Sequence, residues 1–244
     1  MTAQTRLSKR QRRELRKTDA NGCHIDNKFA MRRIIPLTET QEEVFTAYYE
    51  GLNIAAIGTA GTGKSFIALY LALADVFERE EYDRVIIIRS AVQTRDQGAM
   101  PGTLKEKEAY YEMPYVEIVN NLFESRSAYG TLKQKGQIEF MTTSFVRGLT
   151  FDNAIILVDE CQSMSNHELD SIMTRVGENS RIIFCGDTKQ NDLIKNKYDV
   201  SGLKEFLGVL ERMRSFAKIT FKPEDVVRSG LVREYILTKE KLEI

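Results

Sequence analysis

Residues 53–69 read NIAAIGTAGTGKSFIAL, and this stretch decides the fold. Its first five residues form a short apolar run that is typical of a buried strand, and the residues after Ser65 have the apolar spacing of a helix. Between them stand Gly58, Gly63, Lys64 and Ser65 at the spacing GxxxxGK(S/T). A strand, a glycine-rich loop and a helix in this order are the context in which that spacing forms a phosphate-binding loop. The stretch therefore predicts an α/β fold built around an anion site.

The loop supplies three kinds of group for holding ATP or another nucleoside triphosphate. Glycines allow positive φ angles, so successive backbone N–H groups and the start of the following helix can point at the phosphates. Lys64 offers a mobile cation to the β- and γ-phosphates, and Ser65 offers a hydroxyl to Mg²⁺. A glycine-rich turn without a ligand is the alternative, and the flanking strand and helix argue against it. The candidate nucleotide-binding residues are Gly58, Thr59, Ala60, Gly61, Thr62, Gly63, Lys64 and Ser65.

Short apolar segments alternate with helical patterns along the rest of the chain. Strands are expected at residues 53–57, 84–88, 137–142, 154–158, 181–185 and 218–221. Helices are expected at residues 39–49, 65–80, 114–127, 166–176, 203–215 and 231–239. This alternation predicts a mainly parallel sheet covered by helices on both faces. Residues 93–113 have no clean period and contain glycine and proline, so we expect a long surface loop there.

Acidic and amide side chains follow two of the predicted strands. A site that hydrolyses a nucleotide needs a carboxylate for the metal and a group that orients the attacking water. Asp159 leaves its strand at the carboxyl end, where ligands bind in open α/β sheets, so we assign it to Mg²⁺, either as a direct ligand or through a group that binds the ion. Glu160 is assigned as general base or water-positioning group. Gln190, just beyond the strand at 181–185, is the candidate sensor of the γ-phosphate, with an ordinary turn residue as the alternative.

Arginines are further candidates, because a cation that stabilises the transition state can come from the same chain or from a neighbour. Arg89, Arg147, Arg175 and Arg228 each lie near a turn or an element boundary. Their spacing does not choose among them, and for each the alternative is an ordinary surface or ion-pair arginine.

Composition limits the classes of protein to which the chain can belong. The 244 residues are 42% hydrophobic and 29% charged, which is typical of a soluble protein. No apolar run approaches the roughly 20 residues that cross a bilayer, and no signal-peptide pattern opens the chain, so we expect a cytoplasmic protein with no membrane partner. Three cysteines without a CxxC pair favour reduced, mostly buried thiols over a disulfide framework or a zinc site.

The charges are unevenly distributed although the formal net charge is zero. Residues 1–17 contain seven lysines and arginines against the single acid Glu14. We therefore predict two regions, a basic and flexible arm at residues 1–33 and a globular domain at residues 34–244. A basic arm on a slightly acidic body indicates contact with RNA or single-stranded DNA. A solvated tail that keeps the protein soluble is the alternative.

Taken together, the motifs resemble those of the PhoH family, a group of phosphate-loop ATPases whose core is similar to the first RecA-like domain of superfamily-one helicases. The resemblance covers residues 36–232. It rests on Gln41, the loop 58–65, Arg89, Met100-Pro101-Gly102, Glu106-Lys107, Arg147-Gly148, Asp159-Glu160-Cys161-Gln162, Thr174-Arg175-Val176-Gly177, Gly186-Asp187, Gln190, Ser201-Gly202-Leu203 and Asp225-Val226-Val227-Arg228. The sequence departs from the family pattern at Thr59, Ser90, Cys161 and Ser163, and only Ser163 puts a contact in doubt.

The resemblance implies a single RecA-like domain, ATP as the ligand, Gln41 near the adenine, and Arg175 or Arg228 approaching the phosphates, from a neighbouring subunit if the protein forms a ring. It also implies a homo-oligomer, with a hexameric ring as one form. Related helicases place ATP between two RecA-like domains, so a single domain needs a neighbouring copy to supply the second side of the site.

Two functions remain open at this point. One is a Mg²⁺-dependent ATPase that acts on RNA or single-stranded DNA. The other is a regulatory switch that binds ATP, turns it over slowly and has a protein partner. Glu160 favours the ATPase, because a protein that only binds ATP has no need of it. A nucleotide kinase is disfavoured, since residues 222–244 lack an arginine-rich lid.

Overall fold

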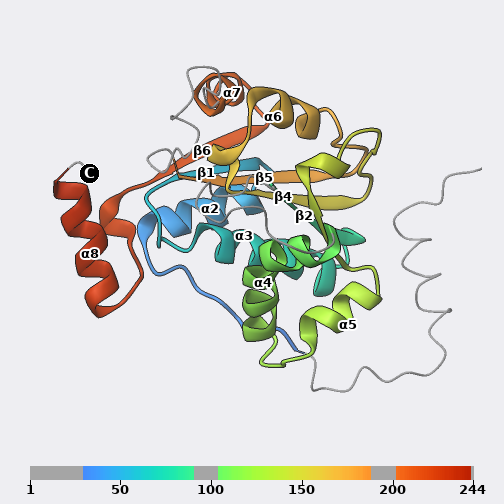
Figure 1. Ribbon diagram of the computed structural model, residues 1–244, viewed down its shortest axis with the longest axis horizontal. Coiled ribbons are helices and arrows are strands. Elements are labelled where there is room, and N and C mark those ends of the chain that lie inside the picture. The colour runs from blue at the N-terminus through green and yellow to red at the C-terminus, as the bar shows by residue number, and fades with distance from the viewer. Residues whose placement is uncertain (1–29, 91–103, 188–201, 243–244) are drawn as a thin grey trace, which may run out of the picture. The chain divides into compact units, whose positions relative to one another are not determined.

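The computed structural model describes residues 30–90, 104–187 and 202–242 (Figure 1). These residues form a six-stranded sheet in the order β3-β2-β4-β5-β1-β6, and every neighbouring pair is parallel. The predicted α/β class and the parallel sheet are confirmed. The strands are β1 Asn53–Gly58, β2 Arg84–Arg89, β3 Ile138–Thr142, β4 Ala154–Asp159, β5 Arg181–Gly186 and β6 Phe216–Phe221.

Burial along the strands explains their sequences. β4 lies inside the sheet, and all of its residues are buried, as expected for a parallel strand that is covered on both faces. β6 lies at one edge, and only Ile219 and Phe221 are buried there, while Lys218 and Thr220 are exposed. Continuous apolar runs therefore mark the centre of the sheet, and alternation marks its edge.

Helices cover both faces of the sheet, as predicted (Figure 1). One face carries α2, α3, α4 and α5, and the other carries α6 and α7. The central helix is α3, whose residues 67–76 are all buried and which contacts β2, β4 and β5. The helices are α2 Glu39–Tyr49, α3 Lys64–Phe77, α4 Leu104–Leu122, α5 Ala128–Gln134, α6 Asn166–Met173, α7 Leu203–Leu210 and α8 Gly230–Lys241.

The prediction was wrong between residues 104 and 134. The expected helix at 114–127 overlaps only the C-terminal part of α4, which begins ten residues earlier, inside the expected loop, and ends at Leu122; α5 follows at Ala128–Gln134 and was not expected. Pro114 therefore lies within α4 instead of near its start. A proline there removes one intrahelical hydrogen bond, and the helix tolerates the loss on its solvent side, since Pro114 and Tyr110 are both exposed. The expected loop residues 93–103 lie outside the described residues.

A polar cluster fastens α2 and α3 to the amino end of β5, away from the loop at residues 58–65. The Tyr48 hydroxyl donates to Asp75 Oδ2 at 2.7 Å, and Arg79 Nη1 pairs with Asp75 Oδ1 at 2.7 Å. The Arg181 guanidinium lies 3.8 Å from the centre of the Tyr48 ring and donates to the Tyr48 carbonyl at 2.7 Å. Burial raises the pKa of Asp75, which is 1% exposed, and the Tyr48 hydrogen bond and the Arg79 charge oppose that rise. The cluster holds the helices that carry the site.

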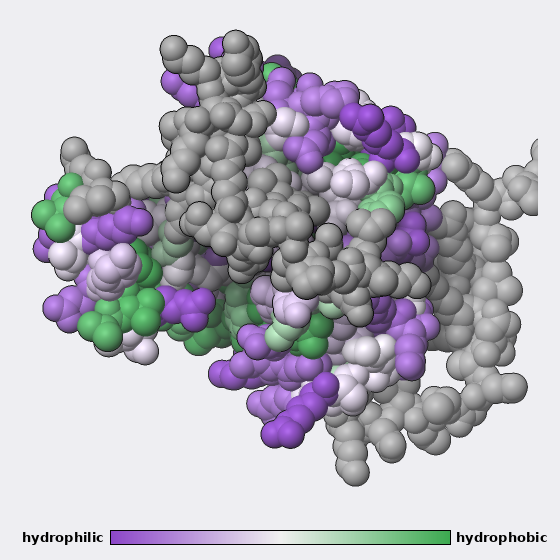
Figure 2. All heavy atoms as spheres, in the orientation of Figure 1, coloured by the Kyte–Doolittle hydropathy of each residue, from purple (hydrophilic) through white to green (hydrophobic). Residues whose placement is uncertain are grey.

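Helix α8 differs from the others because none of its residues is buried. Leu231 is 81% exposed and Tyr235 is 66% exposed. Figure 2 shows green, hydrophobic patches at the end of the molecule where α8 lies. Among the described residues, no helix is long and apolar enough to cross a membrane.

Candidate functional site

The loop between β1 and α3 has the backbone conformation that a phosphate-binding loop requires. Gly58, Gly61 and Gly63 have φ angles of 130°, 75° and 83°. A Cβ atom on Gly58 would lie 2.0 Å from the carbonyl oxygen of Phe221 in β6. Only glycine therefore fits at position 58, because the loop leaves β1 directly against its neighbouring strand.

Hydrogen bonds from two distant segments hold this loop in place. The Val227 N–H donates to the Gly61 carbonyl at 3.1 Å. The Gln41 Nε2 donates to the Thr62 carbonyl at 3.0 Å, and its Oε1 accepts from the Leu37 N–H at 2.7 Å. These bonds use loop carbonyls, and within the described part of the chain no hydrogen bond uses the N–H groups of residues 60–63, so these groups can face an anion.

Lys64 and Ser65 occupy the first turn of α3. The Lys64 ammonium donates to the carbonyls of Gly58 at 2.8 Å and Thr59 at 2.7 Å, so it lies folded over the loop. Burial lowers the pKa of Lys64, and the carboxylates of Asp187 and Asp159 act in the opposite direction.

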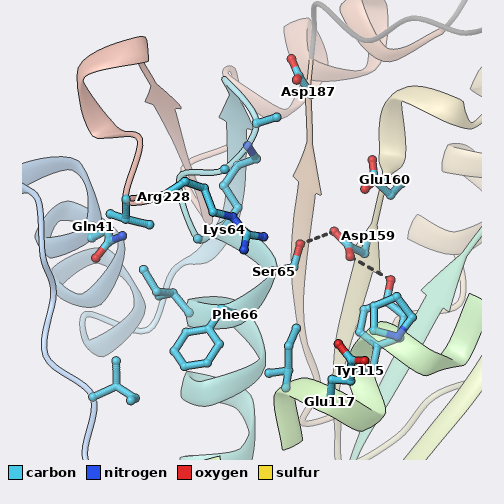
Figure 3. Close-up of a pocket in the computed structure, with 18 of the residues that line it drawn as sticks. Gln41, Lys64, Ser65, Phe66, Tyr115, Glu117, Asp159, Glu160, Asp187 and Arg228 are labelled. Carbon is cyan, nitrogen blue, oxygen red and sulfur yellow. Dashed lines mark hydrogen bonds between the residues drawn. The ribbon is translucent and has the colours of Figure 1, made fainter. Parts of the chain in front are cut away.

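Asp159 ends β4 beside this turn (Figure 3). The Ser65 hydroxyl donates to Asp159 Oδ1 at 2.7 Å, and the Tyr115 hydroxyl of α4 donates to Oδ2 at 2.8 Å. Burial raises the pKa of Tyr115 well above its usual value, and the Asp159 charge adds to the rise, so the hydroxyl stays a donor. Asp159 is 6% exposed, and its two oxygens are therefore held by two hydroxyls in place of water.

Glu160 follows with an unusual backbone. Its φ of 53° and ψ of 42° lie in the left-handed region, which costs a glutamate of the order of 1 kcal/mol or more. Gln162, 3% exposed, donates through Nε2 to Glu160 Oε2 and accepts the Asp187 N–H through Oε1 at 3.0 Å. A Cβ on Gly186 would lie 2.5 Å from Cys161 Sγ and 3.0 Å from that Oε1, so glycine lets Cys161 and Gln162 pack against β5. The strained turn aims Glu160 beside Asp159.

A cavity of about 770 Å³ joins these groups, a size within the range that holds nucleotide-sized ligands. Figure 3 shows Lys64 between Arg228 and Asp159 in this cavity, with Gln41 at one side and Tyr115 at the other. Near Gln41 the lining is apolar and partly exposed, with Leu37 70% exposed. The lining residues outside the loop are Ile34, Ile35, Leu37, Gln41, Phe66, Ile67, Arg89, Pro114, Tyr115, Glu117, Ile118, Asn121, Asp159, Glu160, Gly186, Asp187, Val227 and Arg228.

The oxygen ligands present suit a small hard cation. The Ser65 hydroxyl and the Asp159 carboxylate are the kind of donor that Mg²⁺ takes, and Mg²⁺ usually completes its shell with water and substrate phosphates. Across residues 30–90, 104–187 and 202–242, no cluster of three or more histidine, cysteine or acidic side chains forms a separate metal site. The thiols of Cys161 and Cys185 are buried and unpaired as disulfides, and burial raises the pKa of both, so they stay neutral.

Most residues expected from the sequence lie in this cavity. Arg228 lies at the loop, and its Cγ would be 3.1 Å from a Cβ on Gly61. Arg175 does not line the cavity. It follows α6, and its carbonyl accepts the Phe151 N–H just before β4, at the opposite end of that strand from Asp159. Gln190 lies outside the described residues.

Sequence reasoning missed two parts of the site. Tyr115 has no motif around it, and only the packing of α4 brings it to Asp159. The cavity is also lined by Ile34, Ile35, Leu37 and Phe66, none of which was expected there. A signal existed for Gln162, which belongs to the motif Asp159-Glu160-Cys161-Gln162, but its role was not assigned.

The chain is similar in sequence to known proteins. Residues 33–239 match the family model of the PhoH-like proteins. The chain is 34% identical over 200 residues to the protein PhoH of Escherichia coli strain K12, covering 81% of this chain and 56% of that protein. It is 34% identical over 188 residues to a PhoH-like protein of Synechocystis, covering 77% and 56%. The chain thus spans little more than half the length of these relatives.

Among solved structures, the large terminase of a thermophilic bacteriophage matches with a TM-score of 0.51 and 13% identity, over 84% of this chain and 49% of that one. At that identity the likeness concerns the fold alone.

Proposed function

The chain belongs to the PhoH-like protein family, and from this premise we propose that it binds ATP with Mg²⁺ and hydrolyses it. The observation that carries the proposal is the convergence of Lys64, Ser65, Asp159 and Glu160 on one cavity beside a loop with free N–H groups. A nucleotide-binding fold with a metal carboxylate and a neighbouring second carboxylate has the groups that phosphoryl transfer to water requires.

Each residue has a specific role in this proposal. The loop N–H groups and the Lys64 ammonium bind the β- and γ-phosphates. Ser65 and Asp159 hold Mg²⁺, which when bound neutralises charge on the phosphate oxygens. Glu160 positions the attacking water and accepts its proton. The adenine base of ATP lies toward Gln41 and the apolar residues Ile34 and Leu37.

Steady-state hydrolysis of ATP with Mg²⁺ tests the proposal, with Glu160→Gln as the matched variant. We expect the variant to bind ATP with parental affinity and to lose most of its turnover, because an amide cannot accept the water proton. Parental turnover by Glu160→Gln would remove Glu160 from the mechanism. Tight binding with negligible turnover by the unmodified protein would favour the regulatory switch and direct the search to a protein partner.

We further propose that RNA or single-stranded DNA binds through the basic arm. The seven basic residues within positions 1–17 support this, because each phosphate contact releases counterions and steepens the dependence of affinity on salt. Deleting residues 1–17 should flatten that dependence and reduce stimulation of ATP hydrolysis by single strands. An unchanged salt slope would make the arm a solubility tail.

We also propose a homo-oligomer. In it, Arg175 is the candidate arginine that a neighbouring copy supplies to the site, and Arg228 is the candidate from the same chain. The exposed apolar face of α8 supports an interface between copies. Sedimentation velocity of Leu231→Asp should show dissociation, while Val209→Asp, at an apolar residue of α7 that is 58% exposed, should not. Identical sedimentation of both variants and the parent would exclude α8 from the interface.

A further inference from the structure

The two arginines at the ends of β2 have different surroundings. Arg84, at the amino end, forms an ion pair with Glu139 of β3, with Nη1 and Oε2 3.4 Å apart. Arg89 ends the strand at the carboxyl edge of the sheet, where it is half-buried and lines the cavity. In the part of the chain that the structure describes, its guanidinium lies 5.7 Å from the centroid of the Tyr111 ring and has no hydrogen bond or ion pair.

Carboxylates do lie beside Arg89, but they have other donors. Asp159 is its register partner in β4, and the Asp159 oxygens accept from two hydroxyls. Glu160 accepts from Gln162. Among the described residues, neither carboxylate forms an ion pair with Arg89. Removing part of a cation from water costs free energy unless an anion accompanies it, so the structure keeps Arg89 available to an anionic ligand in the cavity.

Arg89 lies on the other side of Asp159 from the glycine-rich loop. The strands follow one another in the order β1, β5, β4 and β2, so the loop after β1 and the end of β2 flank Asp159 at the end of β4. Lys64 and Arg228 both lie at the loop, and Figure 3 shows Lys64 between Arg228 and Asp159. A phosphoryl group held next to Asp159 would therefore have the cations of the loop on one side and Arg89 on the other.

We propose that Arg89 is a catalytic residue that binds the γ-phosphoryl group in the transition state of ATP hydrolysis. The inference rests on the proposed function, since it adds a group to the reaction assigned to Glu160. In that reaction the water oxygen bonds to the γ-phosphorus, and the water proton passes to Glu160. The bond from the γ-phosphorus to the bridging oxygen breaks, and its electron pair leaves with ADP. A guanidinium offers parallel N–H donors to the phosphoryl oxygens, on which negative charge is spread.

Arg89→Ala removes the guanidinium, and its role is tested without nucleic acid. We expect kcat for ATP to fall by about 100-fold or more, with parental affinity for ADP. The affinity for ADP with aluminium fluoride, which imitates the phosphoryl group in transfer, should fall by a similar factor, because this contact belongs to the transition state. A residue that only supports the fold would change both affinities alike.

Arg84→Ala is the matched control, because Arg84 lies at the other end of the same strand and outside the cavity. Its kcat and both affinities should be parental. Millimolar guanidinium should restore part of the lost turnover in Arg89→Ala and leave the control unchanged. Arg89→Lys keeps a cation at the strand end and provides a test even if Arg89→Ala does not fold. Its kcat should fall with parental affinity for ADP, since an ammonium lacks the planar pair of donors.

The outcomes separate this inference from the proposed function. Parental kcat in either Arg89 variant, or an equal loss of affinity for ADP and for ADP with aluminium fluoride, overturns the role of Arg89 while ATP hydrolysis stands. A variant that loses only affinity for RNA or single-stranded DNA overturns it as well and assigns Arg89 to that ligand. If the unmodified protein hydrolyses no ATP and binds ADP with aluminium fluoride no more tightly than ADP, the proposed function fails, and the role of Arg89 with it.

Discussion

Replacing Gln162 by leucine should slow ATP hydrolysis without weakening ATP binding. Gln162 Nε2 donates to the Glu160 carboxylate, and its Oε1 accepts the Asp187 N–H. Leucine has similar volume and cannot make either bond. A hydrogen bond to a charged group contributes about 1.5–3 kcal/mol, so losing the one that orients Glu160 should lower kcat by about 10- to 100-fold.

The assay measures kcat and KM for ATP by phosphate release and the affinity for a nucleotide by calorimetry. Gln134→Leu, at an exposed position on α5, is the control for the substitution itself. If Gln162 acts through Glu160, Gln162→Leu should have little further effect in a Glu160→Gln background, because coupled residues are not additive. A parental kcat in Gln162→Leu, or a full additional loss in the double variant, would refute the reasoning.

Three other substitutions test the loop and the fold. Lys64→Ala should weaken ATP binding by about 10-fold or more, because it removes the cation that faces the phosphates, and calorimetry with undiminished affinity would contradict the assignment. Gly58→Ala should lower the free energy of unfolding by at least about 1–3 kcal/mol from its positive φ alone, with more from the contact with the Phe221 carbonyl; urea titration measures it, and a parental midpoint would argue against this loop geometry. Tyr48→Phe leaves buried Asp75 without its hydroxyl donor, so the melting temperature should fall by about 3–10 °C. An unchanged melting temperature would show that the Tyr48 hydrogen bond does not stabilise the fold.

The sheet could be predicted because its strands are encoded locally. The apolar runs at β1, β2, β4 and β5 are continuous, since these strands are buried on both faces, and each predicted strand appears within two residues of its observed bounds. The loop and Asp159 were predictable for a related reason. Their positions are fixed by a spacing along the chain and by the rule that ligands gather at the carboxyl ends of parallel strands.

Helix α4 could not be predicted in the same way. Residues 104–113 are LKEKEAYYEM, with no apolar stripe, and Pro114 is more typical of a helix start than of an interior position. The contact of Tyr115 with Asp159 spans 44 residues and depends on how α4 packs, which no local pattern records. Gln162 illustrates the intermediate case, in which a motif predicts the presence of a residue but only the structure gives its hydrogen-bond partners.

The hydrogen bonds from Gln41 and Val227 order the loop before a ligand binds. A loop whose carbonyls are already engaged loses little conformational entropy when a ligand arrives, so less of the binding free energy is spent on ordering it. The site should then bind simple anions such as pyrophosphate. It also follows that a fragment ending at β6 would keep the whole glycine-rich motif and still bind poorly, since residue 227 would be missing. The working unit is the motif together with two segments that lie far from it in the sequence.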